Sequence, residues 1–191
     1  THPLSSSTSR TPPEPTTRCP GLSAPGRRDL AVAVDAAVRI RLVRHAPGAP
    51  GLRLLGLGPG CRPSRGLLKL QRRFRKHAFW AQHRSILDLR QMLRGSAVVV
   101  SLWRGKRLVG FGRASSDGIH RAVLWDIVVA GDLQGRGLGR QVVEALLESP
   151  RLQRVERIYL MTTNSAGFYQ QLGFSSAEPQ QLLIRTSEAS G

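Results

Sequence analysis

The chain contains few cysteines and no long apolar run, and both absences narrow the classes of protein it can belong to. Among its 191 residues are two cysteines, Cys19 and Cys61, which form no metal-binding spacing. We therefore expect a protein of a reducing compartment without a disulfide framework. The sequence has no run of about 18 apolar residues, which argues against a membrane-spanning helix.

Acidic and aromatic residues are also scarce. The chain has 12 Asp and Glu against 29 Lys and Arg, which gives a formal net charge of +17. Such an excess is typical of nucleic-acid-binding surfaces. Aromatic residues make up only 5% of the chain, however, so it offers few side chains on which bases would stack. Nucleic acid is therefore not an expected partner, and the basic surface suits an anionic ligand or an acidic substrate instead.

Composition divides the chain into three parts. Residues 1–36 are rich in Ser, Thr and Pro, which predicts a disordered N-terminal tail. The tail bears Arg and few acids, so it is either dispensable or a transit peptide, and the expected compartment is the cytoplasm or the plastid stroma accordingly. Residues 37–64 hold a candidate first strand, Val38–Leu42, and a Gly/Pro-rich linker. The remainder, 65–191, is the expected domain.

Hydrophobic periodicity predicts an α/β (α+β) domain with a mixed, mostly antiparallel sheet flanked by helices. Two amphipathic helices come first, one over 67–78 and one from the capping pair Ser85 and Asp88 to Gly95. The elements after them are strands at 97–103, 107–114 and 119–129, a helix from Leu138, a strand at 157–161, a short helix at 165–172 capped by Gly173, and a final strand at Gln181–Arg185. Short connections make the first three strands an antiparallel meander, and the helix after them lets the next strand run parallel to the third.

A glycine-rich loop carries the strongest chemical signal. The apolar strand Ile127-Val128-Val129 runs into Gln134-Gly135-Arg136-Gly137-Leu138-Gly139, where a helix begins. Glycines in such a place let an anion approach free backbone N–H groups at the positive end of the helix. The loop lacks the Lys-Ser/Thr of a nucleotide P-loop. Taken alone, it is also explained by a flexible turn from strand to helix.

A second motif, Asn164 to Phe174, places Tyr169 on a short helix between the apolar residues Phe168 and Leu172. Spacing alone favours a core tyrosine. Together, however, the two motifs resemble the GNAT acetyltransferases, with Q-x-x-G-x-G after an apolar strand and F-Y-x-x-x-G-F about 35 residues later. The sequence around Trp125 is similar to those of the cyanobacterial and plastid branch of the family. Gly131 departs from the pattern, since family members usually carry Pro there.

The resemblance covers roughly 65–191 and implies an acetyl-CoA-dependent N-acetyltransferase that works by direct transfer in a ternary complex. Acetyl-CoA would lie beside the splayed third strand, and Tyr169 would act as the acid that protonates the leaving thiolate. The residues implied to contact acetyl-CoA are Ile127, Val128, Val129, Gln134, Gly135, Arg136, Gly137, Leu138, Gly139, Arg140 and Asn164. Asn164 lies closer to the tyrosine than the corresponding Asn of the family usually does.

Asp126 is the candidate general base, because a carboxylate inside an apolar strand needs a partner or a function. A structural Asp bonded to backbone or Arg is an equal alternative. Strict alternation would place it on one face with Leu124 and Val128. His120 is more readily explained as a solvated loop residue. The tryptophans, namely Trp80, Trp103 and Trp125, are expected in the core.

The expected function is transfer of an acetyl group to a primary amine, which is a small amine, a lysine side chain or a protein N-terminus. The alternative is a non-catalytic acyl-CoA-binding regulatory module. Acetyl-CoA and the amine are the expected partners, no metal is expected, no membrane is involved, and a homodimer is left open.

Overall fold

The structure is a computed structural model that describes residues 39–52, 65–177 and 180–186. These residues all belong to one unit, Val38–Gly191. The expected tail at 1–36 lies outside the described residues, as do both cysteines. A five-stranded sheet in the order β1-β2-β3-β4-β5 forms the centre of the unit.

Three long strands make the antiparallel meander that the sequence predicts. They are β2 (Val98–Arg104), β3 (Arg107–Ser116) and β4 (Arg121–Val129). A tight turn at Gly105, whose φ is +56°, joins the first two. Asp117 closes the second turn, because its Oδ1 accepts hydrogen bonds from the N–H groups of Ile119, His120 and Arg121 at 2.8–3.0 Å.

The outer strands extend this meander on both sides. The first strand, β1 (Ile40–His45), pairs antiparallel with β2, so the candidate strand is confirmed but begins and ends later than 38–42. On the other side β5 (Arg157–Leu160) runs parallel to β4, as the intervening helix predicts. The domain expected from the sequence, 65–191, leaves out β1, although β1 belongs to the same sheet. We therefore propose a domain that begins at or before Ile40.

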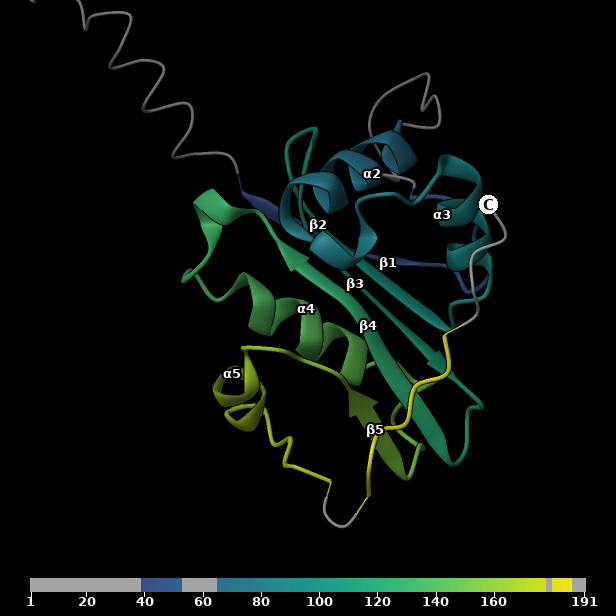
Figure 1. The fold of residues 1–191 in the computed structure, drawn as a ribbon. Helices are drawn as coiled ribbons and strands as arrows, with labels where there is room; N and C mark the ends of the chain where they lie inside the picture. Colours follow the sequence, from purple (N-terminus) through teal and green to yellow (C-terminus); the bar gives the residue numbers. More distant parts are fainter. Residues whose placement is uncertain (1–38, 53–64, 178–179, 187–191) are drawn as a thin grey trace, which may run out of the picture. The chain divides into compact units, whose positions relative to one another are not determined.

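Helices cover both faces of the sheet (Figure 1). One face carries α2 (Gly66–His77), the short 3-10 helix η1 (Phe79–Ala81) and α3 (Ile86–Arg94). At the start of α3 the predicted capping box forms, since Ser85 and Asp88 bond each other's backbone N–H. The other face carries α4 (Leu138–Leu147), which begins after the 3-10 turn η2 (Gly131–Leu133).

The helices α2, α3 and α4 each bury most of the apolar stripe that periodicity predicts. Leu70 and Phe74 of α2 and Leu89 of α3 are fully buried against one face of the sheet. Val142 and Leu146 of α4 are fully buried against the opposite face. The sheet therefore separates two apolar cores, one beneath α4 and one beneath α2 and α3.

The prediction of a final strand at Gln181–Arg185 is wrong. Residues 180–186 are described without a strand, and Leu182, Leu183 and Ile184 are 66%, 86% and 80% exposed. A strand needs a neighbour for its backbone hydrogen bonds, and an apolar sequence with high strand propensity does not supply one. The short helix α5 (Ala166–Gln170) forms as predicted, and Gly173 after it has the left-handed φ of +86°.

Candidate active site

The glycine-rich loop forms the start of α4. The backbone turns through η2, where the N–H of Gln134 bonds the carbonyl of Gly131 at 3.3 Å. Gly135 and Gly137 then both have a φ of +75°, a conformation that residues with a Cβ rarely adopt. Apart from the adjoining residues of the chain, no heavy atom of the described residues lies within 4 Å of the place where either Cβ would be. Glycine is thus required here by the backbone, and the space above it is open.

The loop presents a run of unused hydrogen-bond donors. Within the described part of the chain, none of the backbone N–H groups from Gly135 to Arg140 has an acceptor, and Gln141 is the next to bond, to the carbonyl of Gly137 at 3.0 Å. The first turn of α4 contains no acidic residue. Arg136 and Arg140 are exposed beside it, and Arg140 lies 3.4 Å from Glu144. Free N–H groups, the helix dipole and nearby arginines together suit a phosphate or pyrophosphate.

The strands that precede the loop separate at the same place. β5 pairs with β4 only from Arg121 to Leu124. Over 125–129, β4 has no partner on that side among the described residues. Its outward N–H and C=O groups are therefore available to an extended polar ligand. This is the splayed strand that the resemblance implies.

A β-bulge lies at the point of separation. Arg113 pairs with Trp125 and Phe111 with Val128, so Asp126 and Ile127 together face Gly112 alone. Asp126 is the bulged residue, with a φ of +56°. It is the one non-glycine residue of the described chain with a positive φ. A positive φ within a strand is a strained arrangement that surrounding contacts must hold.

The bulge overturns the expected alternation along β4. Leu124 packs in the core beneath α4, whereas Val128 packs in the core beneath α2 and α3, so the two lie on opposite faces. The prediction that Leu124 shares a face with Asp126 and Val128 is wrong, because one extra residue shifts the period by one position, whereas Asp126 and Val128 do lie on the same side. Gly112 accommodates the bulge, since a Cβ there would lie 2.8 Å from Ile127 Cδ1 and 2.5 Å from Val142 Cγ1.

Asp126 is buried among three donors. Its Oδ2 accepts hydrogen bonds from Arg113 Nε at 2.7 Å and Arg84 Nη1 at 2.9 Å, and its Oδ1 accepts one from Trp80 Nε1 at 3.2 Å. Burial alone would raise the pKa of this carboxyl, but the Arg84 hydrogen bond and the Arg113 charge outweigh it and lower the pKa below its ordinary value. An ionised carboxylate with a low pKa is a weak base. The geometry therefore favours the structural alternative for Asp126.

The sequence did not identify the hydrogen-bond partners of Asp126. An acid inside an apolar strand indicates a cationic partner, but the chain has too many arginines for the sequence to select Arg84 and Arg113. The tryptophan expectation holds in part, since Trp103 is fully buried and Trp125 half-buried. Trp80 is 51% exposed and is not a core residue, because its indole N–H reaches Asp126 from the surface helix η1.

The aromatic segment containing Tyr169 packs beside the glycine-rich loop. Phe168 lies against Gly139, where a Cβ would be 3.3 Å from the ring. The Tyr169 ring makes edge contacts with the rings of Phe168 and Phe174, at centroid distances of 4.9 and 6.0 Å. Burial raises the pKa of Tyr169, so its phenol stays protonated at neutral pH. Its hydroxyl has no hydrogen-bond partner among the described residues, which leaves it free to donate a proton.

Two other candidates lie at the edge of this arrangement or outside it. Asn164 is exposed in the turn before α5, where its Oδ1 accepts a hydrogen bond from Ser165 Oγ at 3.2 Å. His120 is exposed at the opposite end of β4 and lies 3.1 Å from Glu156. The described residues contain no group of three or more His, Cys, Asp or Glu that could hold a metal ion. No helix among them is long and apolar enough to cross a membrane.

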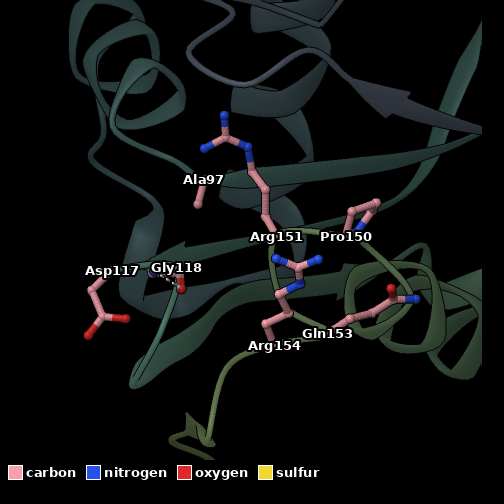
Figure 2. Close-up of a pocket in the computed structure, with 8 residues that line it drawn as sticks. Ala97, Asp117, Gly118, Pro150, Arg151, Gln153 and Arg154 are labelled. Atoms are coloured by element: carbon pink, nitrogen blue, oxygen red, sulfur yellow. Dashed lines mark hydrogen bonds between the residues drawn. The ribbon is translucent and has the colours of Figure 1, made fainter.

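A shallow depression of about 400 Å³ lies elsewhere (Figure 2). Its walls come from the β3–β4 turn, including Asp117 and Gly118, and from the segment after α4, including Arg151 and Arg154. The glycine-rich loop stands at the other end of α4. The depression is therefore separate from the site at the splayed strands.

Comparison with known proteins identifies the family. The family model for the acetyltransferase (GNAT) family matches residues 67–174. The chain is 35% identical over 96 residues to the uncharacterized N-acetyltransferase ycf52 of Pyropia yezoensis, covering 48% of this chain and 55% of that protein. It is 46% identical over 70 residues to the chloroplastic serotonin N-acetyltransferase 2 of rice, Oryza sativa, covering 36% of this chain and 35% of that one. The chain thus spans about half or less of the length of these relatives.

A solved structure agrees on the fold. A crystal structure of a putative GNAT-family acetyltransferase from Xanthomonas campestris superposes with a TM-score of 0.59, at 23% identity, over 77% of this chain and 94% of that one. The mostly antiparallel sheet flanked by helices is confirmed by this likeness. The resemblance to the plastid branch is confirmed by the algal and chloroplastic relatives.

Proposed function

Because the chain belongs to the acetyltransferase (GNAT) family, we propose that it is an enzyme that transfers an acetyl group from acetyl-CoA to a primary amine. The transfer takes place by direct attack of the amine within a ternary complex. The acceptor is a small amine, a lysine side chain or a protein N-terminus. Acetyl-CoA serves as co-substrate.

One observation carries this proposal. Six consecutive backbone N–H groups, from Gly135 to Arg140, have no acceptor among the described residues, and they stand at the start of α4, shortly after the unpaired end of β4. A pyrophosphate next to an extended amide-bearing arm requires this combination of an anion cradle and an open strand edge. Acetyl-CoA has both parts. The loop would hold its pyrophosphate, with Gln134, Arg136 and Arg140 around it, and 127–129 would face the arm.

The chemistry follows from charge that develops during the reaction. Attack of a free amine on the thioester places negative charge on the carbonyl oxygen, which backbone N–H groups near Val128 and Val129 would stabilise. Collapse of the intermediate places charge on the departing sulfur, to which Tyr169 would donate its proton. Holding the two reactants together supplies much of the rate. Water, or a group on the acceptor side, takes the amine proton.

Asp126 has a different part in this proposal. Its pKa is lowered and its oxygens are occupied by Arg84, Arg113 and Trp80. We assign it the role of holding the bulge, which directs the backbone groups of 127–129 toward the open edge of β4. On this account Asp126 shapes the site without accepting the proton.

The proposed compartment is the cytoplasm or, in line with the chloroplastic relatives, the plastid stroma.

The decisive experiment compares turnover with binding in a Tyr169→Phe variant. The substitution removes one oxygen and keeps the ring contacts with Phe168 and Phe174. We expect kcat to fall by about 10²–10⁴-fold, the range for a positioned acid, while acetyl-CoA affinity measured by calorimetry stays within about twofold. Tyr159→Phe is the matched control, because Tyr159 lies where β4 and β5 are still paired.

The outcomes separate enzyme from binding module. Acetyl-CoA binding without turnover of any amine would favour a non-catalytic acyl-CoA-binding regulatory module. Equal single-turnover rate constants for wild type and Tyr169→Phe would show that Tyr169 is a packing residue.

A further inference from the structure

The cluster around Asp126 has more positive charge than its one carboxylate neutralises. We call Trp80, Arg84, Arg113 and Asp126 the arginine cluster. Both arginines pair with the same Asp126 oxygen, so the cluster has two positive charges and one negative. The exposed fractions of the side chains are 29% for Arg84, 14% for Arg113 and 2% for Asp126. One positive charge is therefore left over in a partly desolvated place that still opens to solvent.

The guanidinium groups also have unused donors. An arginine carries five N–H bonds. Arg113 uses its Nε toward Asp126, and Arg84 uses its Nη1 toward Asp126 and the sulfur of Met92. Within the described ranges the terminal nitrogens of Arg113 and Nη2 of Arg84 have no acceptor. Free guanidinium forks of this kind match a carboxylate.

Neighbouring residues hold these forks in place without neutralising them. The Arg84 guanidinium stacks on the Phe74 ring at 5.4 Å, and that of Arg113 stacks on Trp125 at 5.6 Å. Asp88 lies near enough that, after the Ser85 hydrogen bonds, the Arg84 charge helps to lower its pKa, but its carboxylate caps α3 through the Ser85 N–H and is exposed to water, which weakens the interaction with Arg84. The leftover charge is therefore preset for an anion that the described residues do not supply.

An exposed apolar surface adjoins the cluster. Phe79 and Trp80 are 71% and 51% exposed, and their rings meet edge to face at 5.0 Å. Trp80 joins the two features, since its indole N–H holds Asp126 while its ring remains half exposed. A ligand that satisfies both features has an anionic group for the arginines and an apolar group for the aromatic pair.

The cluster lies beside the place where the amine would react. Asp126 lies in the unpaired stretch of β4, and Val128 follows two residues later, about 7 Å along a strand. Groups attached to the acceptor nitrogen would therefore lie within reach of Arg84 and Arg113. A polyamine or a lysine-rich peptide would bring further positive charge to a cluster that already has an excess.

We propose that the acceptor is an amine that also carries a carboxylate and an apolar side group, as an aromatic or aliphatic amino acid does. The carboxylate binds Arg84 and Arg113, and the apolar group rests on Trp80 and Phe79. This inference rests on the proposed acetyl transfer and names its acceptor class.

Matched acceptor pairs test the inference. Tryptophan and tryptamine differ by the carboxylate alone, as do phenylalanine and phenethylamine, and kcat/KM is compared at equal concentrations of free amine with saturating acetyl-CoA and the full chain. We expect the carboxylate-bearing member to be favoured by about tenfold to a hundredfold, the range for a hydrogen bond to a charged group. Equal values, or a preference for the decarboxylated amine, would overturn the inference while leaving acetyl transfer intact.

Variants of Arg84 locate the effect. Because Arg84 also holds Asp126, Arg84→Gln is judged by a ratio: kcat/KM for tryptophan divided by kcat/KM for tryptamine should fall by about tenfold or more, and Arg84→Lys should restore part of that ratio. Arg90→Gln is the control, since it removes a positive charge from an exposed position of α3 outside the cluster. A loss of tryptophan preference of the same size in Arg90→Gln would assign the effect to overall charge and contradict the proposal.

Product binding keeps the inference testable if no amine is turned over. With CoA present, N-acetyltryptophan should bind at least about tenfold more tightly than N-acetyltryptamine in calorimetry. Equal affinities would reject the acceptor class. Absence of turnover together with this binding difference would count against the proposed reaction and not against the carboxylate site.

Discussion

Replacing Asp126 by Asn tests whether this residue is structural or catalytic. Asn adopts a positive φ nearly as readily as Asp, so the backbone of the bulge is not strained further. Its amide oxygen still accepts the Trp80 hydrogen bond, but its Nδ2 is a donor and faces the two arginine donors, so both arginine hydrogen bonds are lost together with the negative charge. Two arginines would then remain partly buried with no counter-charge.

The magnitude follows from the burial of the ion pairs. Breaking a fully buried pair costs about 3–5 kcal/mol, but Arg84 and Arg113 are 29% and 14% exposed and water relieves part of this cost. We therefore expect Asp126→Asn to lower the free energy of unfolding by about 1–3 kcal/mol at neutral pH. For a domain of this size, that is a decrease in Tm of about 2–12 °C.

The pH dependence has a definite sign. The folded-state pKa of Asp126 lies below the unfolded value of about 3.9, so its ionisation stabilises the fold above that pH. This stabilisation disappears as the pH falls through the folded pKa. The difference in unfolding free energy between wild type and Asp126→Asn should therefore be largest near pH 7 and shrink below about pH 4.

Urea unfolding at several pH values, with turnover measured on the same samples, checks these expectations. Glu148→Gln is the control, because Glu148 pairs with Arg44 at the surface and should change stability by less than about 0.5 kcal/mol. If Asp126 is structural, the pH profile of kcat/KM keeps its acidic limb in Asp126→Asn. A variant that is as stable as wild type but has lost that limb would refute the reasoning and identify Asp126 as the base.

Two glycine substitutions test the loop and the bulge. Gly137→Val should abolish acetyl-CoA binding in calorimetry, because a branched side chain at a φ of +75° strains the loop and blocks approach to its backbone. Gly118→Val is the control, since Gly118 has a φ of +84° in the distant β3–β4 turn. It should cause similar strain without changing the affinity for acetyl-CoA. Equal affinity for all three proteins would mean that the loop is not the pyrophosphate site. Gly112→Ala should lower the free energy of unfolding by about 1–3 kcal/mol in urea titrations, since its Cβ would lie 2.5 Å from Val142; wild-type stability would show that α4 shifts freely.

Local chemistry explains which parts of the fold the sequence predicted. The capping box at Ser85 and Asp88, the left-handed cap at Gly173 and the glycine-rich loop each depend on residues within a few positions of one another. The parallel pairing of β5 with β4 follows from the intervening helix. These features need no knowledge of distant contacts, so patterns in the sequence were sufficient.

Features that depend on distant contacts were not predictable in this way. The bulge at Asp126 requires Gly112 opposite it on another strand. No pattern in the apolar sequence of β4 indicates that this strand contains an extra residue. Arg84 lies 42 residues from Asp126 and is one of many arginines. The segment Gln181–Arg185 has strand composition, but whether it pairs depends on a neighbouring edge that composition does not specify.

The bulge and the arginine cluster act as one structural unit. Asp126 has a backbone conformation that is strained by about 1–2 kcal/mol for a residue with a Cβ, and its bulge interrupts the ladder between β3 and β4. What offsets this strain is the set of bonds from Arg113 on β3, Arg84 before α3 and Trp80 on η1. These bonds fix the same side chains that would receive the acceptor and the same backbone that would face the thioester. On the proposed function, the fold would set the position of the acceptor relative to acetyl-CoA before either ligand binds, which is the condition under which proximity contributes most to the rate.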